Sequence, residues 1–280
     1  MTSDTVFLER EYNARLAIRD HPQIFARWAE QGAAARRMRA CEVDLQYGPL
    51  SVERLDIFHA HQSDAPLLVF IHGGYWRSLD KSDFAFVAGP MLAQGIAVAN
   101  VNYDLCPDAA IATIVDECRR AVAWVAREGE RHGAAPDAIV VGGHSAGGHL
   151  AAMMVATDWA AQGLLRAPLV GALTLSGVHD LSPMPMFSFN SDLKLDAAEA
   201  RRLSPVLMPP RAPVPVLCAV GAAETSEFLR QTQLLWDAWP QNRPPGAPGP
   251  LVIPGKHHFD VVVEHADPGS ALTRGTLALF

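Results

Sequence analysis

One short segment constrains the fold of this chain more than any other. The apolar run Ala138–Val141 predicts a buried strand, and the apolar stretch Gly147–Ala156 predicts a helix. Between them, Gly143–Gly147 has the sequence G-H-S-A-G, a turn of small residues. A G-x-S-x-G turn between a strand and a helix is typical of a nucleophile elbow, whose serine projects to where a base can reach it. The segment therefore predicts that Ser145 is a nucleophile, with the start of a helix behind it.

The rest of the chain alternates short apolar runs with segments of helical spacing. This order predicts an α/β fold around a doubly wound, mostly parallel sheet. Further strands are expected at Leu67–Ile71, Ile96–Val101, Val170–Leu175, Val214–Val220 and Leu251–Ile253. Further helices are expected at Ser82–Ala93, Ile111–Arg131, Glu227–Trp239 and Ala271–Phe280. Two alternating segments, Glu42–Tyr47 and Val52–Phe58, predict an antiparallel hairpin at one edge of the sheet.

A chain of 280 residues, 49% of them hydrophobic, is expected to form one α/β domain over residues 1–280. A helical segment, comprising one or two helices, is expected at about residues 1–40. The regular pattern breaks at about residues 180–210, which are rich in proline and methionine. We expect a cap insertion there, over the carboxyl edge of the sheet where ligands bind in open α/β folds. A packed surface loop is the alternative.

Charge and cysteine content exclude several classes of protein. The net charge of -7 disfavours binding to nucleic acid, whose phosphates the chain would repel. No apolar run approaches the ~20 residues of a membrane span, and the N-terminus lacks the pattern of a signal peptide, so we expect a cytoplasmic protein. The four cysteines form no C-x-x-C pair and no zinc-type cluster, so no metal is expected. A homodimer stays open.

A second motif, His72–Trp76 with the sequence H-G-G-Y-W, directly follows the predicted strand Leu67–Ile71. Glycines let a backbone approach a substrate closely, and backbone N–H groups aimed at a carbonyl oxygen stabilise the charge that develops there during acyl transfer. Esterases carry an HGGG-type sequence at this position. The predicted donors of this oxyanion hole are the N–H groups of Gly74, Tyr75 and Ala146. The alternative is a plain turn after a strand.

A nucleophilic serine needs a base, and the base needs an acid that orients it. The base is expected after the last strand, where His257 and His258 are adjacent. The acid is expected after the strand Val214–Val220, where Glu224 is the preferred residue. Asp180, which follows the preceding strand, competes with it, although a turn or cap would also explain Asp180.

Other residues near these motifs are given structural roles. Glu227 is expected inside the following helix, where an acid near the N-terminus is favourable. His149 lies one turn into the elbow helix and is expected to pack rather than react. The ring of His144 is expected to point away from the base, because this residue precedes the serine.

Taken together, these motifs resemble the α/β-hydrolase type of kynurenine formamidase (arylformamidase) and its esterase relatives. The resemblance covers most of the chain and rests on Leu8–Arg15, His72–Trp76, Gly143–His149, Ser176–Leu181, Leu203–Pro205, Glu227–Gln231 and His258–Asp260. It implies an α/β-hydrolase fold, Ser145 as nucleophile, His258 as base, an oxyanion hole at Gly74 and Tyr75, and neither cofactor nor metal. The family's acid is usually Asp, and Glu224 occupies the matching position, which keeps Asp180 open.

The resemblance also implies a function. We expect a serine hydrolase that cleaves a small acyl amide or ester through an acyl-enzyme, with an aryl formamide such as N-formylkynurenine as the first candidate. A short-chain carboxylesterase is the nearest alternative, and a non-catalytic ligand-binding α/β-hydrolase fold is a distant one. Four aromatic side chains are candidates for the wall that receives a flat substrate, although some of them could be ordinary packing residues: Tyr75, Trp76, Phe187 and Phe189.

Overall fold

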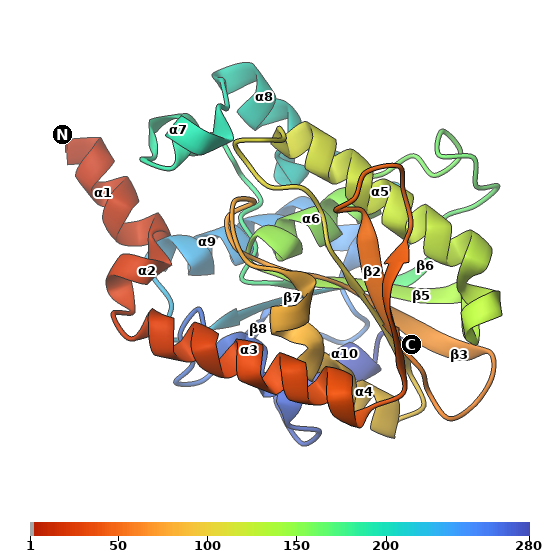
Figure 1. Ribbon diagram of the computed structural model, residues 1–280. Helices are drawn as coiled ribbons and strands as arrows, with labels where there is room; N and C mark the ends of the chain where they lie inside the picture. The colour runs from red at the N-terminus through yellow and green to blue at the C-terminus, as the bar shows by residue number, and fades with distance from the viewer. Residues whose placement is uncertain (1–2) are drawn as a thin grey trace.

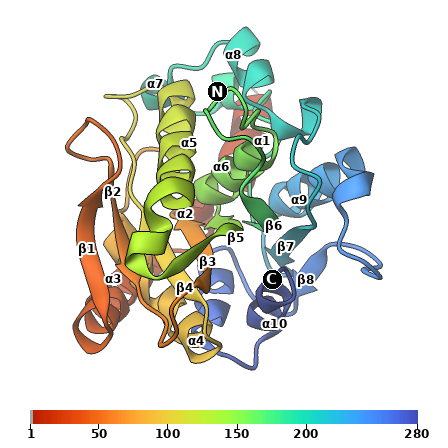
Figure 2. The ribbon, with the colours of Figure 1, turned by 90° about the vertical axis from the view of Figure 1, so that its right-hand side faces the viewer.

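A central eight-stranded sheet organises the computed structural model, which describes residues 3–280. The strands lie in the order β1-β2-β4-β3-β5-β6-β7-β8. Their bounds are β1 Cys41–Gln46, β2 Arg54–Phe58, β3 Ala65–Ile71, β4 Ala97–Val101, β5 Ala134–His144, β6 Leu169–Leu175, β7 Val216–Gly221 and β8 Leu251–Ile253. β2 pairs antiparallel with β1 and β4, and the remaining pairs are parallel. In Figure 2, β1 and β2 form one edge of the sheet and β8 lies at the other.

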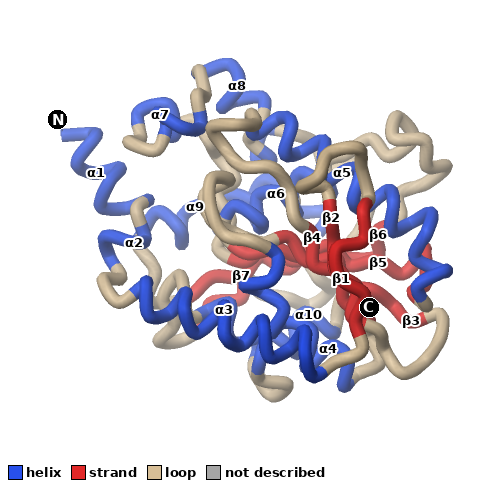
Figure 3. Tube along the Cα trace, in the orientation of Figure 1, coloured by secondary structure: helices blue, strands red, loops and turns tan. Residues whose placement is uncertain are grey.

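Helices cover both faces of this sheet. Their bounds are α1 Ser3–Tyr12, α2 Ala14–Ala17, α3 His21–Met38, α4 Ala88–Ala93, α5 Ile111–Glu128, α6 Ala146–Val155, α7 Asn190–Leu193, α8 Ala197–Arg202, α9 Ser226–Ala238 and α10 Ala271–Leu277. Figure 3 shows the strands as a middle layer, with α5 and α6 above it and α3, α4 and α10 below. The α/β-hydrolase architecture expected from the sequence, with its antiparallel hairpin at one edge, is therefore confirmed.

The interior strands explain why this order was visible in the sequence. β4 is buried along its whole length, and β3 is buried at every residue except Pro66. A parallel sheet covered on both faces selects continuous apolar runs of this kind. Because the parallel strands all run in one direction, the residues that follow β3, β5, β6 and β7 meet at a single edge of the sheet.

Two local details differ from the expectations. The N-terminal segment forms three helices within the described residues, because Asn13 and Ile18 leave the helical region with ψ of 80° and 89°; Met1 and Thr2 lie outside the described residues. The hairpin strand β2 begins at Arg54 instead of Val52. The Glu53 carboxylate accepts a hydrogen bond of 2.7 Å from the Leu50 N–H group, which closes the connection as a loop.

The N-terminal helices are attached to the second half of the chain at the carboxyl edge of the sheet. The Tyr12 hydroxyl donates to the Glu227 carboxylate on α9 at 2.6 Å, and the Thr225 hydroxyl donates to the Glu11 carbonyl at 2.5 Å. The Ser188 N–H group, before α7, donates to Glu9 at 2.9 Å. In Figure 1, α1, α2 and α7 accordingly gather at one end of the molecule. No helix among residues 3–280 is long and apolar enough to cross a membrane.

Candidate active site

Ser145 occupies a sharp turn between β5 and α6. Its φ of 56° and ψ of -119° lie outside the regions that non-glycine residues ordinarily adopt, and its N–H group is held by the Leu175 carbonyl at 2.8 Å. A Cβ atom on Gly147 would collide with the carbonyl oxygen of Ile71, so a glycine is required for α6 to pack this closely against the end of β3. Strained backbone of this kind is typical of a nucleophile elbow.

Three side chains from different strand ends form one hydrogen-bonded chain. The Oγ atom of Ser145 lies 3.0 Å from Nε2 of His258, and Nδ1 of His258 lies 2.6 Å from Oε2 of Glu224. Both the imidazole and the carboxylate are buried. An Nδ1–H group that donates to the carboxylate leaves Nε2 free to accept the serine proton. The arrangement can therefore raise the nucleophilicity of the Ser145 hydroxyl.

The carboxylate of Glu224 is itself held in place. Its second oxygen, Oε1, accepts hydrogen bonds from the Ser176 hydroxyl at 2.5 Å and from the Gly221 N–H group at 2.8 Å. The longer glutamate side chain is thus accommodated at the turn after β7. Asp180, the competing acid, instead accepts from the Ser182 N–H group at 3.0 Å, which closes a local turn. Sequence reasoning missed the role of Ser176, whose only local signal is that it directly follows β6.

The loop after β8, residues 254–260, carries both histidines and is called the catalytic loop from here on. His257, the other histidine of this loop, makes its contacts away from Ser145. Nδ1 of His257 accepts hydrogen bonds from the N–H groups of Phe259 and Asp260, and its Nε2 atom lies 2.9 Å from the Asp260 carboxylate. The structure thus brings His258, and not its neighbour, to Ser145.

The expectation that the ring of His144 points away from the predicted base is wrong. The ring lies beside His258. Its Nε2–H group donates to the backbone carbonyl of His258 at 2.8 Å, and the two rings lie 4.8 Å apart. The backbone reverses sharply at Ser145, so the preceding side chain projects toward Trp28 of α3 and packs beneath the catalytic loop. Burial, with the nearby His258, lowers the pKa of His144 well below its usual range. His144 is therefore neutral and positions the loop of His258.

The predicted oxyanion loop has an unusual backbone. Gly74, Tyr75 and Trp76 have φ values of 119°, 54° and 55°. The Gly74 carbonyl accepts from the Arg77 N–H group at 3.1 Å and from the Ser78 hydroxyl at 3.0 Å, which fixes the orientation of this peptide unit. Among residues 3–280, no hydrogen bond forms from the N–H groups of Gly74, Tyr75 or Ala146. These three amides are available to a developing oxyanion.

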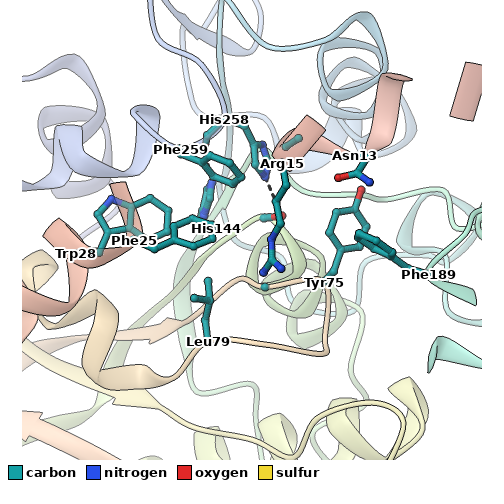
Figure 4. Close-up of a pocket in the computed structure, with 13 residues that line it drawn as sticks. Asn13, Arg15, Phe25, Trp28, Tyr75, Leu79, His144, Phe189, His258 and Phe259 are labelled. Atoms are coloured by element: carbon teal, nitrogen blue, oxygen red, sulfur yellow. Dashed lines mark hydrogen bonds between the residues drawn. The ribbon is translucent and has the colours of Figure 1, made fainter. Parts of the chain in front are cut away.

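A pocket leads to the Ser145 hydroxyl, and Figure 4 shows the residues around it. One part of the wall comes from the N-terminal helices, and the rest comes from the loops after the strands. The lining residues are Asn13, Ala14, Arg15, Phe25, Trp28, Gly74, Tyr75, Leu79, His144, Ser145, Phe189, His258 and Phe259. Sequence reasoning identified none of those contributed by residues 13–28, because nothing in the local pattern places them here.

The four aromatic residues proposed as a substrate wall divide into two pairs. Tyr75 and Phe189 line the pocket, with ring centroids 5.2 Å apart. Trp76 does not line it, since its indole is fully buried against the ring of His149. Phe187 is also buried behind the wall, where it packs on Tyr75 and Phe189. The positive φ of Trp76 turns its side chain inward. Trp76 and Phe187 therefore lie behind the pocket wall that Tyr75 and Phe189 form.

The described residues contain no group of three or more histidine, cysteine, aspartate or glutamate side chains arranged to hold a metal ion. The polar side-chain groups of the residues that line the pocket are two hydroxyls, two imidazoles, an amide, a guanidinium and an indole N–H. The fold, together with the hydrogen-bonded Ser145, His258 and Glu224, defines an α/β-hydrolase with a buried serine, histidine and carboxylate.

Comparisons with known proteins identify the family. The chain is 30% identical to kynurenine formamidase of Salmo salar over 254 residues, which cover 88% of this chain and 84% of the relative. A solved structure from Silicibacter sp. TM1040, described as a candidate thioesterase, is 33% identical, covers 95% of this chain and 97% of its own, and has a TM-score of 0.84. The family model BD-FAE matches residues 55–167. Esterase LipQ of Mycobacterium tuberculosis is 34% identical over 42% of this chain and 30% of its own length.

The chain belongs to the kynurenine formamidase family, as its motifs indicated. It is an α/β-hydrolase enzyme that hydrolyses amide or ester bonds of small acyl substrates.

Proposed function

We propose that Ser145, His258 and Glu224 form a catalytic triad that hydrolyses an aryl formamide such as N-formylkynurenine. The observation that carries this proposal is the unbroken chain of hydrogen bonds from Ser145 through His258 to Glu224 at the end of a pocket. The aromatic rings of Tyr75 and Phe189 offer a flat substrate a matching surface. The relatedness to kynurenine formamidases supports an aryl formamide over other amides.

In the first half of the reaction, the Ser145 hydroxyl attacks the formyl carbon while Nε2 of His258 accepts the hydroxyl proton. The carbonyl oxygen becomes an oxyanion and accepts hydrogen bonds from the N–H groups of Gly74, Tyr75 and Ala146. Glu224 stabilises the imidazolium that forms. The tetrahedral intermediate then collapses: the carbon–nitrogen bond breaks, and His258 gives its proton to the departing aryl amine.

In the second half, water replaces the amine. His258 accepts a proton from the water as its oxygen attacks the formyl-enzyme. The same three amides stabilise the second oxyanion, and the collapse returns the proton to Ser145 and releases formate. Every proton transfer uses His258, so the hydrogen bonds that hold its ring and its loop contribute to both halves.

A short-chain carboxylesterase is the second candidate. The match to an esterase over 42% of the chain favours it, and the same triad and amides would form an acetyl-enzyme in place of a formyl-enzyme. The two candidates differ in the leaving group, which would occupy the outer part of the pocket.

A substrate panel separates the two candidates. Purified protein should be assayed with N-formylkynurenine, p-nitrophenyl acetate and p-nitrophenyl butyrate, with Ser145→Ala as the control for uncatalysed hydrolysis. We expect kcat/KM to be highest for N-formylkynurenine, although the nitrophenyl esters have the better leaving group. If the esters have the higher kcat/KM and N-formylkynurenine is not cleaved, the protein is a carboxylesterase and the formamidase proposal is wrong.

A further inference from the structure

Within residues 3–280, the pocket contains one permanent cation and no acid. Arg15 is the only arginine or lysine of this part of the chain that lines it, and none of these lining residues is an aspartate or glutamate. This is notable in a chain with a net charge of -7. Arg15 belongs to the segment Leu8–Arg15, a motif to which the proposed triad and oxyanion hole assign no role.

The guanidinium of Arg15 has hydrogen-bonding capacity left over. Its Nη2 atom donates to the Ser78 hydroxyl at 2.7 Å, and its central carbon lies 5.5 Å from the centre of the Phe25 ring. Within the described part of the chain, no carboxylate forms an ion pair with it. An arginine carries five N–H donors, so a ligand can accept from those that remain.

The neighbouring arginine, Arg77, already forms an ion pair with a carboxylate. Arg77 pairs with the Asp192 carboxylate at 2.8 Å and lies over the Phe189 ring at 4.3 Å. Partial burial and the charge of Arg77 lower the pKa of Arg15. An anion bound beside Arg15 would relieve this unfavourable environment, whereas Arg77 already has the Asp192 carboxylate as its partner.

The segment that carries Arg15 is held rigidly at the site. The Tyr75 hydroxyl donates to the Tyr12 carbonyl at 2.5 Å, which joins the oxyanion loop to the end of α1. On the other side, the Thr225 and Ser226 hydroxyls donate to Glu11 at 2.5 Å and 2.7 Å. A charged group mounted in this way is preorganised, so binding loses little conformational entropy. In Figure 4, the Arg15 side chain reaches into the pocket, with Phe25 and Trp28 on one side and Tyr75 and Phe189 on the other.

We propose that Arg15 binds a carboxylate on the leaving group of the substrate, so that the enzyme selects aryl formamides that bear a carboxylate over those that lack one. The inference rests on the proposed function in placing the acyl group at Ser145. A planar guanidinium matches a carboxylate with two parallel hydrogen bonds, and such charge-assisted bonds are stronger than neutral ones. Aromatic rings around the same cation fit the aryl part of such a substrate.

Arg15 has a second potential role, which is to position the oxyanion loop instead of binding the substrate. Ser78 receives a hydrogen bond from Arg15 and donates one to the Gly74 carbonyl at 3.0 Å, so Arg15 could act only by positioning the oxyanion loop. A positioning role would lower kcat for every substrate. A binding role would raise KM for carboxylate-bearing substrates alone.

The first experiment does not depend on formamidase activity. Benzoate and benzamide have the same shape and differ in charge, and each is tested as a competitive inhibitor of p-nitrophenyl acetate hydrolysis. We expect the unsubstituted enzyme to bind benzoate more tightly than benzamide. Arg15→Gln should weaken benzoate inhibition roughly 10- to 100-fold and leave benzamide inhibition unchanged. Arg15→Lys should retain part of the preference, since it keeps the charge and loses the planar fork.

The matched control is Arg19→Gln, which changes the net charge equally at an exposed position outside the pocket. It should leave both inhibition constants unchanged. Equal weakening of benzoate and benzamide by Arg15→Gln, or no change in either, would overturn the proposal. Melting temperatures of the variants establish that each is folded.

The second experiment uses N-formylkynurenine and formanilide, a neutral aryl formamide. Arg15→Gln should raise KM roughly 10- to 100-fold for N-formylkynurenine only, with kcat nearly unchanged. Ser78→Ala, which keeps the cation, should leave the preference for N-formylkynurenine intact. If both variants lower kcat for both substrates equally, Arg15 is a positioning residue. If N-formylkynurenine is not cleaved while benzoate still depends on Arg15, the proposed function fails and the anion site stands.

Discussion

The two halves of the pocket are built in different ways. The strand-end half contains Ser145 and His258, and Glu224 lies behind His258 without lining the pocket. Each of the three follows a strand by a short turn. The N-terminal half, residues 13–28, comes from helices that are attached to the sheet edge through side-chain contacts with Tyr75 and with residues 225–231. The first half is positioned by the backbone of the sheet, and the second by contacts between segments about 200 residues apart in the chain.

Because the two halves of the pocket are held in different ways, we expect them to serve different functions. Strand ends in a covered parallel sheet can hold reacting atoms to within a few tenths of an ångström, as proton transfer and attack require. Attached helices can be exchanged or altered without disturbing the sheet, so they suit the choice of substrate. We therefore expect substitutions in the strand-end half to change kcat and those in the N-terminal half to change KM.

The largest effect is expected at Ser145. Ser145→Ala should lower kcat by roughly 10⁴- to 10⁶-fold, because members of a triad act as a unit. A fluorophosphonate should label this residue alone, as shown by intact mass and peptide mapping. The melting temperature should stay near that of the unsubstituted protein. Near-normal turnover by the variant, or labelling at another serine, would remove the catalytic role from the elbow.

The second-largest effect is expected at Glu224, and it distinguishes this carboxylate from Asp180 at the same edge of the sheet. Glu224→Gln should lower kcat by roughly 10²- to 10⁴-fold, because the imidazolium loses its stabilising charge. Asp180→Asn is the matched control: it perturbs only a turn and should cost about 1 kcal/mol of stability with kcat nearly unchanged. Both quantities follow from steady-state kinetics and thermal melts. The reverse pattern would assign the acid to the strand β6.

The same contrast explains what the sequence could predict. The order of strands and helices, the elbow at Ser145 and the glycines at Gly74 and Gly147 all depend on local patterns, and the fold followed from them. Glu224 and Asp180 could not be separated, since both leave strand ends that border one site, and only the side-chain contacts distinguish them.

The N-terminal half could not be predicted for a physical reason. Nothing in residues 13–28 shows which surface they cover, because their contacts are made with distant segments. The predicted orientation of His144 was wrong for a related reason. The strand pattern shows on which face of the sheet a side chain lies, but it does not show that the catalytic loop packs against that face next to Ser145. Trp76 illustrates the same point, since a positive φ turned it into the core.

The third effect concerns acid stability of the strand-end half. His265 is buried just after the catalytic loop, neither of its ring nitrogens has a partner among the described residues, and burial lowers its pKa to about 4. In the unfolded chain, His265 binds a proton near pH 6.5, whereas in the folded protein it does so only near pH 4. Protonation therefore favours unfolding: the free energy of unfolding is at its full value above about pH 6.5 and decreases as the pH falls toward 4. His265→Leu should flatten the fall by about 1.4 kcal/mol per pH unit.

Thermal melts from pH 7 to pH 4 measure this slope. His61→Leu is the control, since His61 is exposed and should not contribute. An unchanged slope in His265→Leu would mean that other groups, such as His149 and His179 with pKa values lowered to about 4 and about 3, account for the acid sensitivity.

The smallest effect tests how the N-terminal half is attached. The Tyr12 hydroxyl donates to Glu227 at 2.6 Å and accepts from the Gln231 side chain at 2.9 Å. Tyr12→Phe removes both bonds and a longer one of 3.4 Å from Arg230, while Glu227 keeps its ion pair with Arg230, so the loss of stability should be about 1–3 kcal/mol. The end of α1 should then hold Arg15 less firmly.

KM for N-formylkynurenine should therefore rise by about 3- to 10-fold in Tyr12→Phe, with kcat close to that of the unsubstituted enzyme. Tyr47→Phe is the matched control, because it also removes a buried tyrosine hydrogen bond, of 2.6 Å to the Asn102 carbonyl, but lies outside the pocket. It should lose similar stability and keep its KM. A fall in kcat for Tyr12→Phe with KM unchanged would show that the N-terminal helices act on the oxyanion loop through Tyr75, and the division of tasks between the two halves would not hold.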